Sequence, residues 1–491
     1  MNGIVSIRPL LAILVSLCIT PLLASSRNSN IREAWTFFAA TLKFLIVVSM
    51  LPVILKGENI YFTVAHIMPG LSISLRVDAL GMIFALVSSS LWIITSAYSI
   101  GYMRGLKEHS QTRYFCFFAL AMSATIGVAF SANLITMYMF YEMLSFATYP
   151  LVTHHQDEEA KGSGRRYLFY IVGTSIGFVL PSMIITYYFA GTLEFRAGGI
   201  LHGIHPEWLF TLTVFMFIFG FAKVAIMPFH AWLPAAMVAP TPVSALLHAV
   251  AVVKVGAFCI IRVITQVLGK EMLTLHNLNL LICLIASITI LVGSLIALSQ
   301  DEFKRRLAFS TISQLSYIVL GVALLNPKAF IGASCHIAMH AFGKITLFFC
   351  AGNVFVATGI KHISKMKGIG KRMPITMLAF FIGSLSVIGL PPTGGFFSKW
   401  YLLLGTVNVH SDIFLAVLLI SSLLNAAYFL PIVYNAFFCP EEESQFEGGI
   451  KEAPLWCLIP TVLCALGSIG LFFFPELFLN LSKIALNLIG L

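Results

Sequence analysis

The sequence carries very little charge. Asp, Glu, Lys and Arg make up 10% of its 491 residues, whereas hydrophobic residues make up 59%. A soluble protein needs far more charge to cover its surface, and the mean hydropathy of +0.93 points the same way. Long polar blocks are missing too, since the longest hydrophilic stretches run only about 15 to 20 residues. The composition therefore excludes a soluble globular fold and places the function inside the bilayer.

Signatures of cofactor chemistry are also missing. The 9 cysteines include no CxxC pair and have no histidine at metal-ligand spacing, so we interpret them as small hydrophobic side chains. The sequence contains no nucleotide loop, no nucleophile–base pair and no flavin or iron–sulfur pattern. We therefore expect no cofactor and no metal, and we assign any redox reaction to partner proteins. Whether the chain belongs to an enzyme complex stays open.

The net charge of +10 arises from Lys and Arg in short connecting segments. A bias of such residues to one side is typical of membrane proteins, so we do not expect nucleic acid as a partner. About 17 basic residues fall on one side of the predicted helices and about 8 on the other. With an even number of helices, this distribution predicts a multi-pass membrane protein with both termini outside.

Long uncharged windows identify the membrane spans. Ala79 to Met103, Tyr114 to Tyr141 and Tyr167 to Leu193 each exceed the roughly 20 residues that cross a bilayer. The pattern predicts an all-α integral membrane protein with about fourteen transmembrane helices. The first apolar run, near residues 4–24, could be a secretory signal, but the many later spans favour a membrane helix. Residues 59–76 alternate around a Pro-Gly turn and predict a small external hairpin.

Charged residues inside predicted spans are the main functional signal, because a charge at bilayer depth costs roughly 2.5 to 3.5 kcal/mol. Glu142 lies about ten residues from either end of its helix, too far for snorkelling. It could belong to an ion route or to a fixed ion pair that only holds two helices together. Lys223 is followed by four prolines between residues 228 and 242, which break the helix and predict an ion site. We expect Glu142 and Lys223 to form a charge pair.

A second interruption, GLPPTGGFFSKWY, precedes Lys399. This lysine could be a titrating gate or a fixed donor to the broken backbone. Between the two breaks, His336, His340 and Lys344 recur at a spacing of four and share one helix face. The stripe predicts a proton relay, because histidine titrates near neutral pH and a desolvated lysine can release its proton there too. Each histidine alone could instead have a packing role.

Three further residues have less defined roles. His248 and Lys254 lie on the helix after the first break and should point about 120° apart. Lys254 could link the first site to the stripe, whereas His248 could hydrogen-bond to the broken backbone. Lys43 is interpreted as a snorkelling side chain or a contact to another subunit.

Five motifs together resemble the antiporter-like family shared by multisubunit Mrp cation/proton antiporters, respiratory complex I and membrane-bound hydrogenases. They are YEMLSFATYPLV, FAKVAIMPFHAWLPAAMVAPTPVSALLHA, DEFKRRLAFSTISQLSYI, HAFGKITLFFCAG and GLPPTGGFFSKW. The resemblance covers roughly residues 75–440 and implies fourteen helices with two inverted five-helix repeats and two broken helices, the seventh and the twelfth. The implied units are residues 1–110 with three helices and the hairpin, 111–270 and 271–440 as the repeats, and 441–491 with the last helix.

The resemblance also implies roles for the charged residues. Glu142 and Lys223 match the family's Glu/Lys pair, Lys399 matches its terminal lysine, and Lys254 and the His336 stripe match its central hydrophilic axis. The predicted proton-translocation residues are Glu142, Lys223, His248, Lys254, His336, His340, Lys344 and Lys399.

Within the family, the terminal lysine and the short C-terminal segment resemble most closely the D subunit of Mrp antiporters or its hydrogenase counterpart. The implied function is proton translocation within a multisubunit Na⁺/proton antiporter, with other hydrophobic subunits, lipid, protons and sodium as partners. One alternative is the N-type subunit of complex I, and another is a stand-alone solute carrier.

Overall fold

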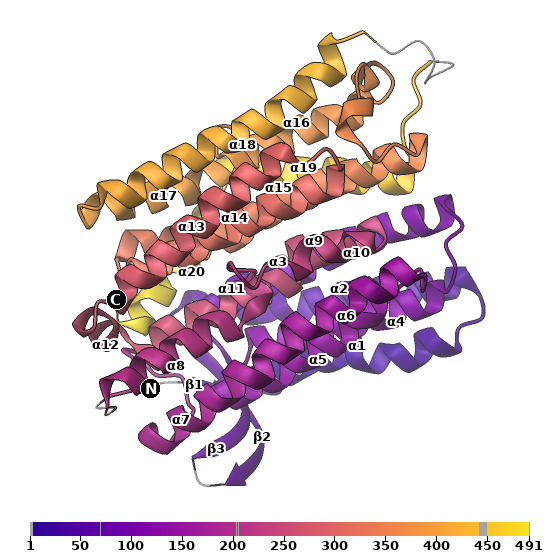
Figure 1. Ribbon diagram of the computed structural model, residues 1–491. Coiled ribbons are helices and arrows are strands. Elements are labelled where there is room, and N and C mark those ends of the chain that lie inside the picture. Colours follow the sequence, from indigo (N-terminus) through magenta and orange to yellow (C-terminus); the bar gives the residue numbers. More distant parts are fainter. Residues whose placement is uncertain (1–2, 69, 203, 205, 441–448, 491) are drawn as a thin grey trace.

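The computed structural model describes residues 3–490 except 69, 203, 205 and 441–448, so the start of the last predicted unit lies outside the described residues. Long helices running roughly parallel to one another dominate the structure (Figure 1). Among the described residues, 11 helices are long and apolar enough to cross a membrane, and α8 (Glu207–Gly220) and α16 (Pro374–Ile388) are shorter apolar helices. The all-α membrane class is thus confirmed, whereas the total of fourteen spans and the inverted repeats stay predictions.

A small sheet lies at one end of the helical bundle. β1 (Gly3–Val5) pairs in parallel with β2 (Asn59–Met68), which pairs antiparallel with β3 (Leu71–Val77). The predicted hairpin is therefore confirmed. The sequence did not predict β1, because three residues are too few to show an alternating pattern.

The described residues of the first part of the chain form seven helices. They are α1 (Arg8–Ser25), α2 (Ser29–Leu55), α3 (Ala79–Gly105), α4 (Gln111–Ala129), α5 (Leu134–Val152), α6 (Glu158–Thr174) and α7 (Leu180–Ala190). A π-helical turn, η1 (Ser175–Val179), joins α6 and α7 into one span. Ser123 Oγ donates to the carbonyl of Ile13 at 2.9 Å, so α1 is held in the bundle like the membrane helix that we predicted.

The middle of the chain is irregular. After α8 it forms η2 (Ala222–Val224), α9 (Trp232–Ala235), η3 (Ala236–Val238), α10 (Thr241–Ala245), η4 (Leu246–Val250), α11 (Val252–Val263), η5 (Ile264–Leu268) and α12 (Lys270–Leu275). The segments η4 and η5 are π-helical, so the helix predicted over 243–268 is not a regular α-helix. π-helical turns are rare and frequently occur at functional sites.

The second part of the chain packs around α15. Its elements are α13 (Leu278–Ser299), α14 (Phe303–Ala323), α15 (Pro327–Thr358), η6 (Ile363–Lys365), η7 (Ile369–Lys371), α16, α17 (Gly395–Asn408), α18 (Asp412–Phe438), α19 (Leu455–Phe473) and α20 (Glu476–Ile489). The predicted single helix near 455–480 is in fact two helices. They are separated at Phe474 and Pro475, where the Phe474 backbone leaves the helical region with φ −127° and ψ 59°.

Both ends of the described chain lie at the same end of the bundle as the hairpin (Figure 1). β1 pairs with β2, and the Gly198 N–H donates to the carbonyl of Ile489 at 3.2 Å. The segment before Gly198 contacts the hairpin, since Arg76 Nη1 donates to the carbonyl of Phe195 at 3.0 Å. The hairpin side of the bundle is the side with fewer lysines and arginines, so both termini of the described chain lie on that side.

Candidate functional site

Lys223 lies inside the first break rather than before it. α8 ends at Gly220, and Lys223 belongs to the turn η2. Side chains satisfy the freed backbone: the Lys223 N–H donates to the Tyr141 hydroxyl at 3.3 Å, and the Trp232 indole N–H donates to the carbonyl of Ala222 at 2.9 Å. Broken backbone at membrane depth is tolerated where protein groups satisfy it in this way.

The turn that contains Lys223 packs directly on α11. A Cβ added to Gly256 would lie 2.2 Å from the main-chain nitrogen of Val224 and 2.5 Å from the main-chain carbon of Lys223. Side-chain carbons do not approach a backbone this closely, so only glycine fits at this contact. The position of Lys223 therefore depends on α11 as well as on its own segment.

Lys223 and Glu142 do not form a direct salt bridge. The buried Lys223 ammonium donates to the main-chain carbonyl of Tyr141, the residue before Glu142, and lies 3.3 Å from the centre of the Tyr141 ring. Among the described residues, neither carboxylate oxygen of Glu142 has a hydrogen-bond partner. Lys223 therefore contacts the main chain beside Glu142 rather than its carboxylate.

The irregular helix after the first break changes where His248 and Lys254 point. His248 lies in the π-helical turn η4, and Ala251 has φ −117° and ψ −83°. Both side chains contact α15, although a regular helix would point them about 120° apart. The His248 ring lies 4.7 Å from the Phe348 ring, centre to centre, and Lys254 contacts His340. Neither His248 nitrogen has a partner among the described residues, so the predicted bond to the broken backbone is not found.

Lys254 joins the histidine stripe of α15. Lys254 Nζ lies 2.7 Å from His340 Nδ1, and the rings of His340 and His336 stack with their centres 5.3 Å apart. His336 Nδ1 in turn lies 2.9 Å from Ser398 Oγ on α17. All four side chains are buried. They form a continuous polar series from α11 across α15 to the helix that follows the second break.

Lys344 has its hydrogen bonds outside this series, although it shares a face of α15 with both histidines. Its ammonium donates to Ser310 Oγ at 2.8 Å and to the carbonyl of Leu307 at 3.3 Å. The Tyr428 hydroxyl also donates to Ser310 Oγ, at 3.0 Å. Lys344 thus has its polar contacts on α14, near α18, and the stripe predicted from the spacing of four divides after His340.

Lys399 lies beside the second break. Its ammonium donates to the carbonyl of Ile388, the last residue of α16, at 3.0 Å and to Ser422 Oγ at 3.3 Å. This is the contact expected of a fixed donor to the broken backbone. The Tyr317 ring lies 4.7 Å from Lys399 Nζ and stacks on His336 at 5.9 Å, so Lys399 also adjoins the polar series.

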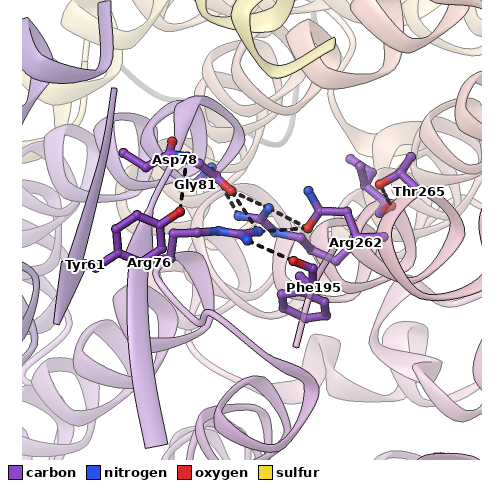
Figure 2. Close-up of polar contacts among 10 residues, drawn as sticks. Tyr61, Arg76, Asp78, Gly81, Phe195, Arg262 and Thr265 are labelled. Carbon is purple, nitrogen blue, oxygen red and sulfur yellow. Dashed lines mark hydrogen bonds and ion pairs between the residues drawn. The ribbon is translucent and has the colours of Figure 1, made fainter. Parts of the chain in front are cut away.

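A buried ion cluster escaped the sequence prediction. Arg262 on α11 is fully buried and donates to both carboxylate oxygens of Asp78, at 2.5 and 2.7 Å (Figure 2). Arg76 Nη2 lies 3.2 Å from Asp78, and Gln266 accepts from both arginines at 3.0 Å. Burial raises the pKa of Asp78, but the two guanidinium groups outweigh it and lower the pKa to about 2.

The cluster ties three elements together at the hairpin end. Arg76 lies on β3, Asp78 caps α3 by accepting from the Gly81 N–H at 2.9 Å, and Arg262 lies on α11. Arg262 could have been found by the rule that selected the lysines, since it is a charge inside a predicted span. Its partner Asp78 lies just before a span and gives no such signal.

Lys43 has neither of its expected roles. It is fully buried, and its ammonium donates to Ser16 Oγ at 2.5 Å and to the carbonyl of Met122 at 3.0 Å. The Trp92 ring lies 5.0 Å from Nζ. Lys43 therefore links α2 to α1 and α4 inside the protein, where it cannot reach the membrane interface.

The site as a whole offers protonatable groups with unused hydrogen-bonding capacity. The Nε2 atoms of His336 and His340, both nitrogens of His248 and both oxygens of Glu142 are buried without a partner among the described residues. Buried polar atoms are nearly always hydrogen-bonded, often by ordered water. Such a series can pass protons between side chains and water without electron transfer.

These features define a polytopic helical membrane protein with a buried charged axis between two broken helices. The family model described as NADH:quinone oxidoreductase/Mrp antiporter, TM, matches residues 131–425, and the chain belongs to this family. Among curated relatives, NADH-quinone oxidoreductase subunit N of Desulforudis audaxviator is 33% identical over 448 residues, 87% of each chain. Na(+)/H(+) antiporter subunit A1 of Staphylococcus aureus is 29% identical over 89% of this chain, which spans 57% of that relative's length.

Two solved structures share the fold. The archaeal membrane-bound sulfane sulfur reductase complex contains a chain that matches with a TM-score of 0.87 at 24% identity, covering 99% of this chain and 98% of that one. The Mrp complex of Dietzia contains one that matches with a TM-score of 0.85 at 20% identity, covering 98% and 97%. These matches show the shared fold, whereas the family model and the 33% identical relative confirm the resemblance inferred from the motifs.

Proposed function

We propose that this protein is a proton-translocating subunit of a multisubunit Na⁺/proton antiporter in a bacterial or archaeal cell membrane. The observation that supports this most strongly is the buried series of Lys254, His340, His336 and Ser398, which reaches Lys399 through Tyr317. Lysine and histidine each bind and release a proton, so the series provides a route that needs no cofactor.

In this proposal the route begins at the Glu142 and Lys223 sites beside the first break and ends at Lys399 beside the second. His248 and Lys344 supply protonatable groups next to the main series. The units 111–270 and 271–440 would be the two repeats, and both termini would lie outside, at the end with fewer basic residues. The partners would be other hydrophobic subunits, lipid, protons and sodium ions.

A second candidate is the N-type subunit of an NADH:quinone oxidoreductase, or a related hydrogenase subunit. The relative that favours it is 33% identical and is named subunit N. The charged axis would serve the same proton movement there, but partner subunits would drive it by a redox reaction.

Reconstitution tests the main proposal. The complex is purified in mild detergent and placed in vesicles that contain a pH-sensitive dye, and a sodium gradient is then imposed. We expect a pH change in vesicles with the native chain and a large loss with Lys254→Met. The exposed Lys56→Met serves as the matched control and should transport normally.

Equal pH changes with Lys254→Met and Lys56→Met would contradict translocation along the axis. The copurified subunits distinguish the remaining possibilities. Subunits that oxidise NADH or hydrogen would favour the second candidate, and a stable chain that purifies alone would favour a solute carrier.

A further inference from the structure

A group of metal-binding side chains lies away from the charged axis, at the end of the bundle opposite the hairpin. Glu108 and His109 lie in the loop between α3 and α4, and His154 and His155 follow α5. The helices α4 and α5 separate the two pairs along the chain, so neither loop by itself shows the spacing of a metal-binding motif. Only the packing of the loops brings the four residues together.

The Glu108 carboxylate lies at the centre of this group. Its Oε2 atom is 3.9 Å from His109 Nδ1, 3.9 Å from His154 Nε2 and 3.8 Å from His155 Nδ1. The ligand atoms of Glu108, His109 and His154 all lie within 4.8 Å of one another. A tetrahedral zinc ion with bonds of about 2.0 to 2.2 Å holds its ligand atoms roughly 3.3 to 3.6 Å apart, so small movements would bring these three side chains to ligand spacing. His155 lies outside this group of three and must approach further to become the fourth ligand.

His154 is the second observation that points to a ligand. Its side chain is 0% exposed, yet neither ring nitrogen has a hydrogen-bond partner among the described residues. An unpaired imidazole nitrogen can bind a metal ion.

We propose that Glu108, His109, His154 and His155 form a binding site for a divalent transition-metal ion of the Zn²⁺ type. Three imidazoles and one carboxylate are ligands that Zn²⁺ prefers. Glu108 and His155 also line a cavity of about 320 Å³, which gives an ion and its water access from the surface. A bound ion would fasten the α3–α4 loop to the segment after α5.

Two positive charges lie near the site. Arg113 Nη2 donates to the main-chain carbonyl of His154 at 2.7 Å, and Lys304 lines the same cavity as Glu108. Among the described residues, no hydrogen bond joins Arg113 or Lys304 to a ring nitrogen of the proposed ligands. They weaken cation binding without blocking the ligand atoms, so we expect a site that prefers strong nitrogen binders such as Zn²⁺ over Mg²⁺ or Ca²⁺.

Titration of Zn²⁺ into the purified, tag-free complex tests the proposal, with a fluorescent zinc indicator as competitor. We expect one Zn²⁺ ion per chain at this site. His109→Ala with His155→Ala should weaken its binding by more than roughly tenfold, because changing even an outer-shell partner of a metal site costs that much. Both histidines are partly exposed, with side chains 49% and 34% accessible, so the double variant should fold.

A control variant, His66→Ala, and a second measurement, the melting temperature, complete the test of Zn²⁺ binding. His66→Ala removes an exposed histidine from the hairpin at the other end of the molecule and should bind as the native chain does. Zn²⁺ should also raise the melting temperature of the native chain and of His66→Ala but not that of the double variant. Equal Zn²⁺ affinity in the native chain and the double variant would overturn the proposal.

Discussion

The ammonium of Lys254 and the imidazole of His340 are joined by a hydrogen bond of 2.7 Å, although 86 positions separate them in the chain. The bond crosses from α11 to α15, and therefore from the first predicted repeat to the second. Each group can hold or release a proton, so this contact is the step at which a proton would pass between the two halves of the axis.

His340→Ala should slow proton transport by roughly tenfold or more, because the relay loses the group that receives the proton from Lys254. Protein abundance should fall much less, since a packing role would lower both together. Transport in vesicles and abundance on immunoblots measure the two effects. His410→Ala, at an exposed turn, is the control. Parallel falls in transport and abundance would favour a packing role.

Glu142→Gln should abolish most transport while leaving the complex assembled. The amide keeps the size of the side chain but removes the negative charge beside the carbonyl that Lys223 contacts. Because Glu142 makes no direct salt bridge with any described residue, its loss should not release two helices from each other. Native gels of membrane extracts report assembly, and the exposed Glu271→Gln is the control. Loss of the complex from the membrane would instead show that Glu142 is structural.

Lys399→Arg separates a titrating lysine from a fixed donor. Arginine can still donate to the Ile388 carbonyl, but it cannot lose its proton at any accessible pH. The variant should therefore assemble normally and fail to translocate. The comparison uses pH-gradient-driven transport in vesicles with matched protein content. Near-normal transport would show that Lys399 acts only as the fixed donor to the broken backbone.

Asp78→Asn should destabilise the protein by about 3 to 5 kcal/mol at neutral pH, because it leaves the buried Arg262 without its counter-charge. The folded pKa of about 2 lies below the ordinary aspartate value near 3.9. The carboxylate therefore stabilises the fold above about pH 4, and this contribution is lost as the pH falls toward 2.

Thermal unfolding of the native chain and Asp78→Asn at pH 7 and pH 3 checks the loss of stability and its dependence on pH. The difference in melting temperature between the two proteins should be smaller at pH 3 than at pH 7. The exposed Asp412→Asn should have nearly the native melting temperature at both pH values. A difference that stays constant with pH would contradict the assigned ionisation of Asp78.

Gly256→Ala should shift the turn that contains Lys223, because the new Cβ would overlap the backbone at Val224. We expect a loss of about 1 to 3 kcal/mol in stability and reduced transport. Gly173→Ala is the matched control, since its Cβ would meet nothing within 4 Å. The melting temperature and vesicle transport of both variants measure the effect. Equal behaviour of the two variants would mean that the contact between η2 and α11 is not needed.

The sequence by itself determined the membrane class, the hairpin and the two broken helices. Scarce charge and long apolar runs leave a chain no other stable environment than the bilayer. Clustered prolines disfavour a continuous helix, although single prolines lie inside helices such as α1 and α18. The same reasoning selected Lys223, Lys254 and Lys399, because a charge inside a span is costly in any arrangement of the helices.

Tertiary structure alone decided the partners of these charges. Lys344 shares a helix face with His340, yet its ammonium bonds to α14 because that helix packs beside it. Lys43 was expected at an interface but is buried against α1 and α4. The pairing of Arg262 with Asp78 likewise depends on two segments 184 positions apart. Periodicity describes one helix at a time, whereas a hydrogen bond between helices depends on how they pack.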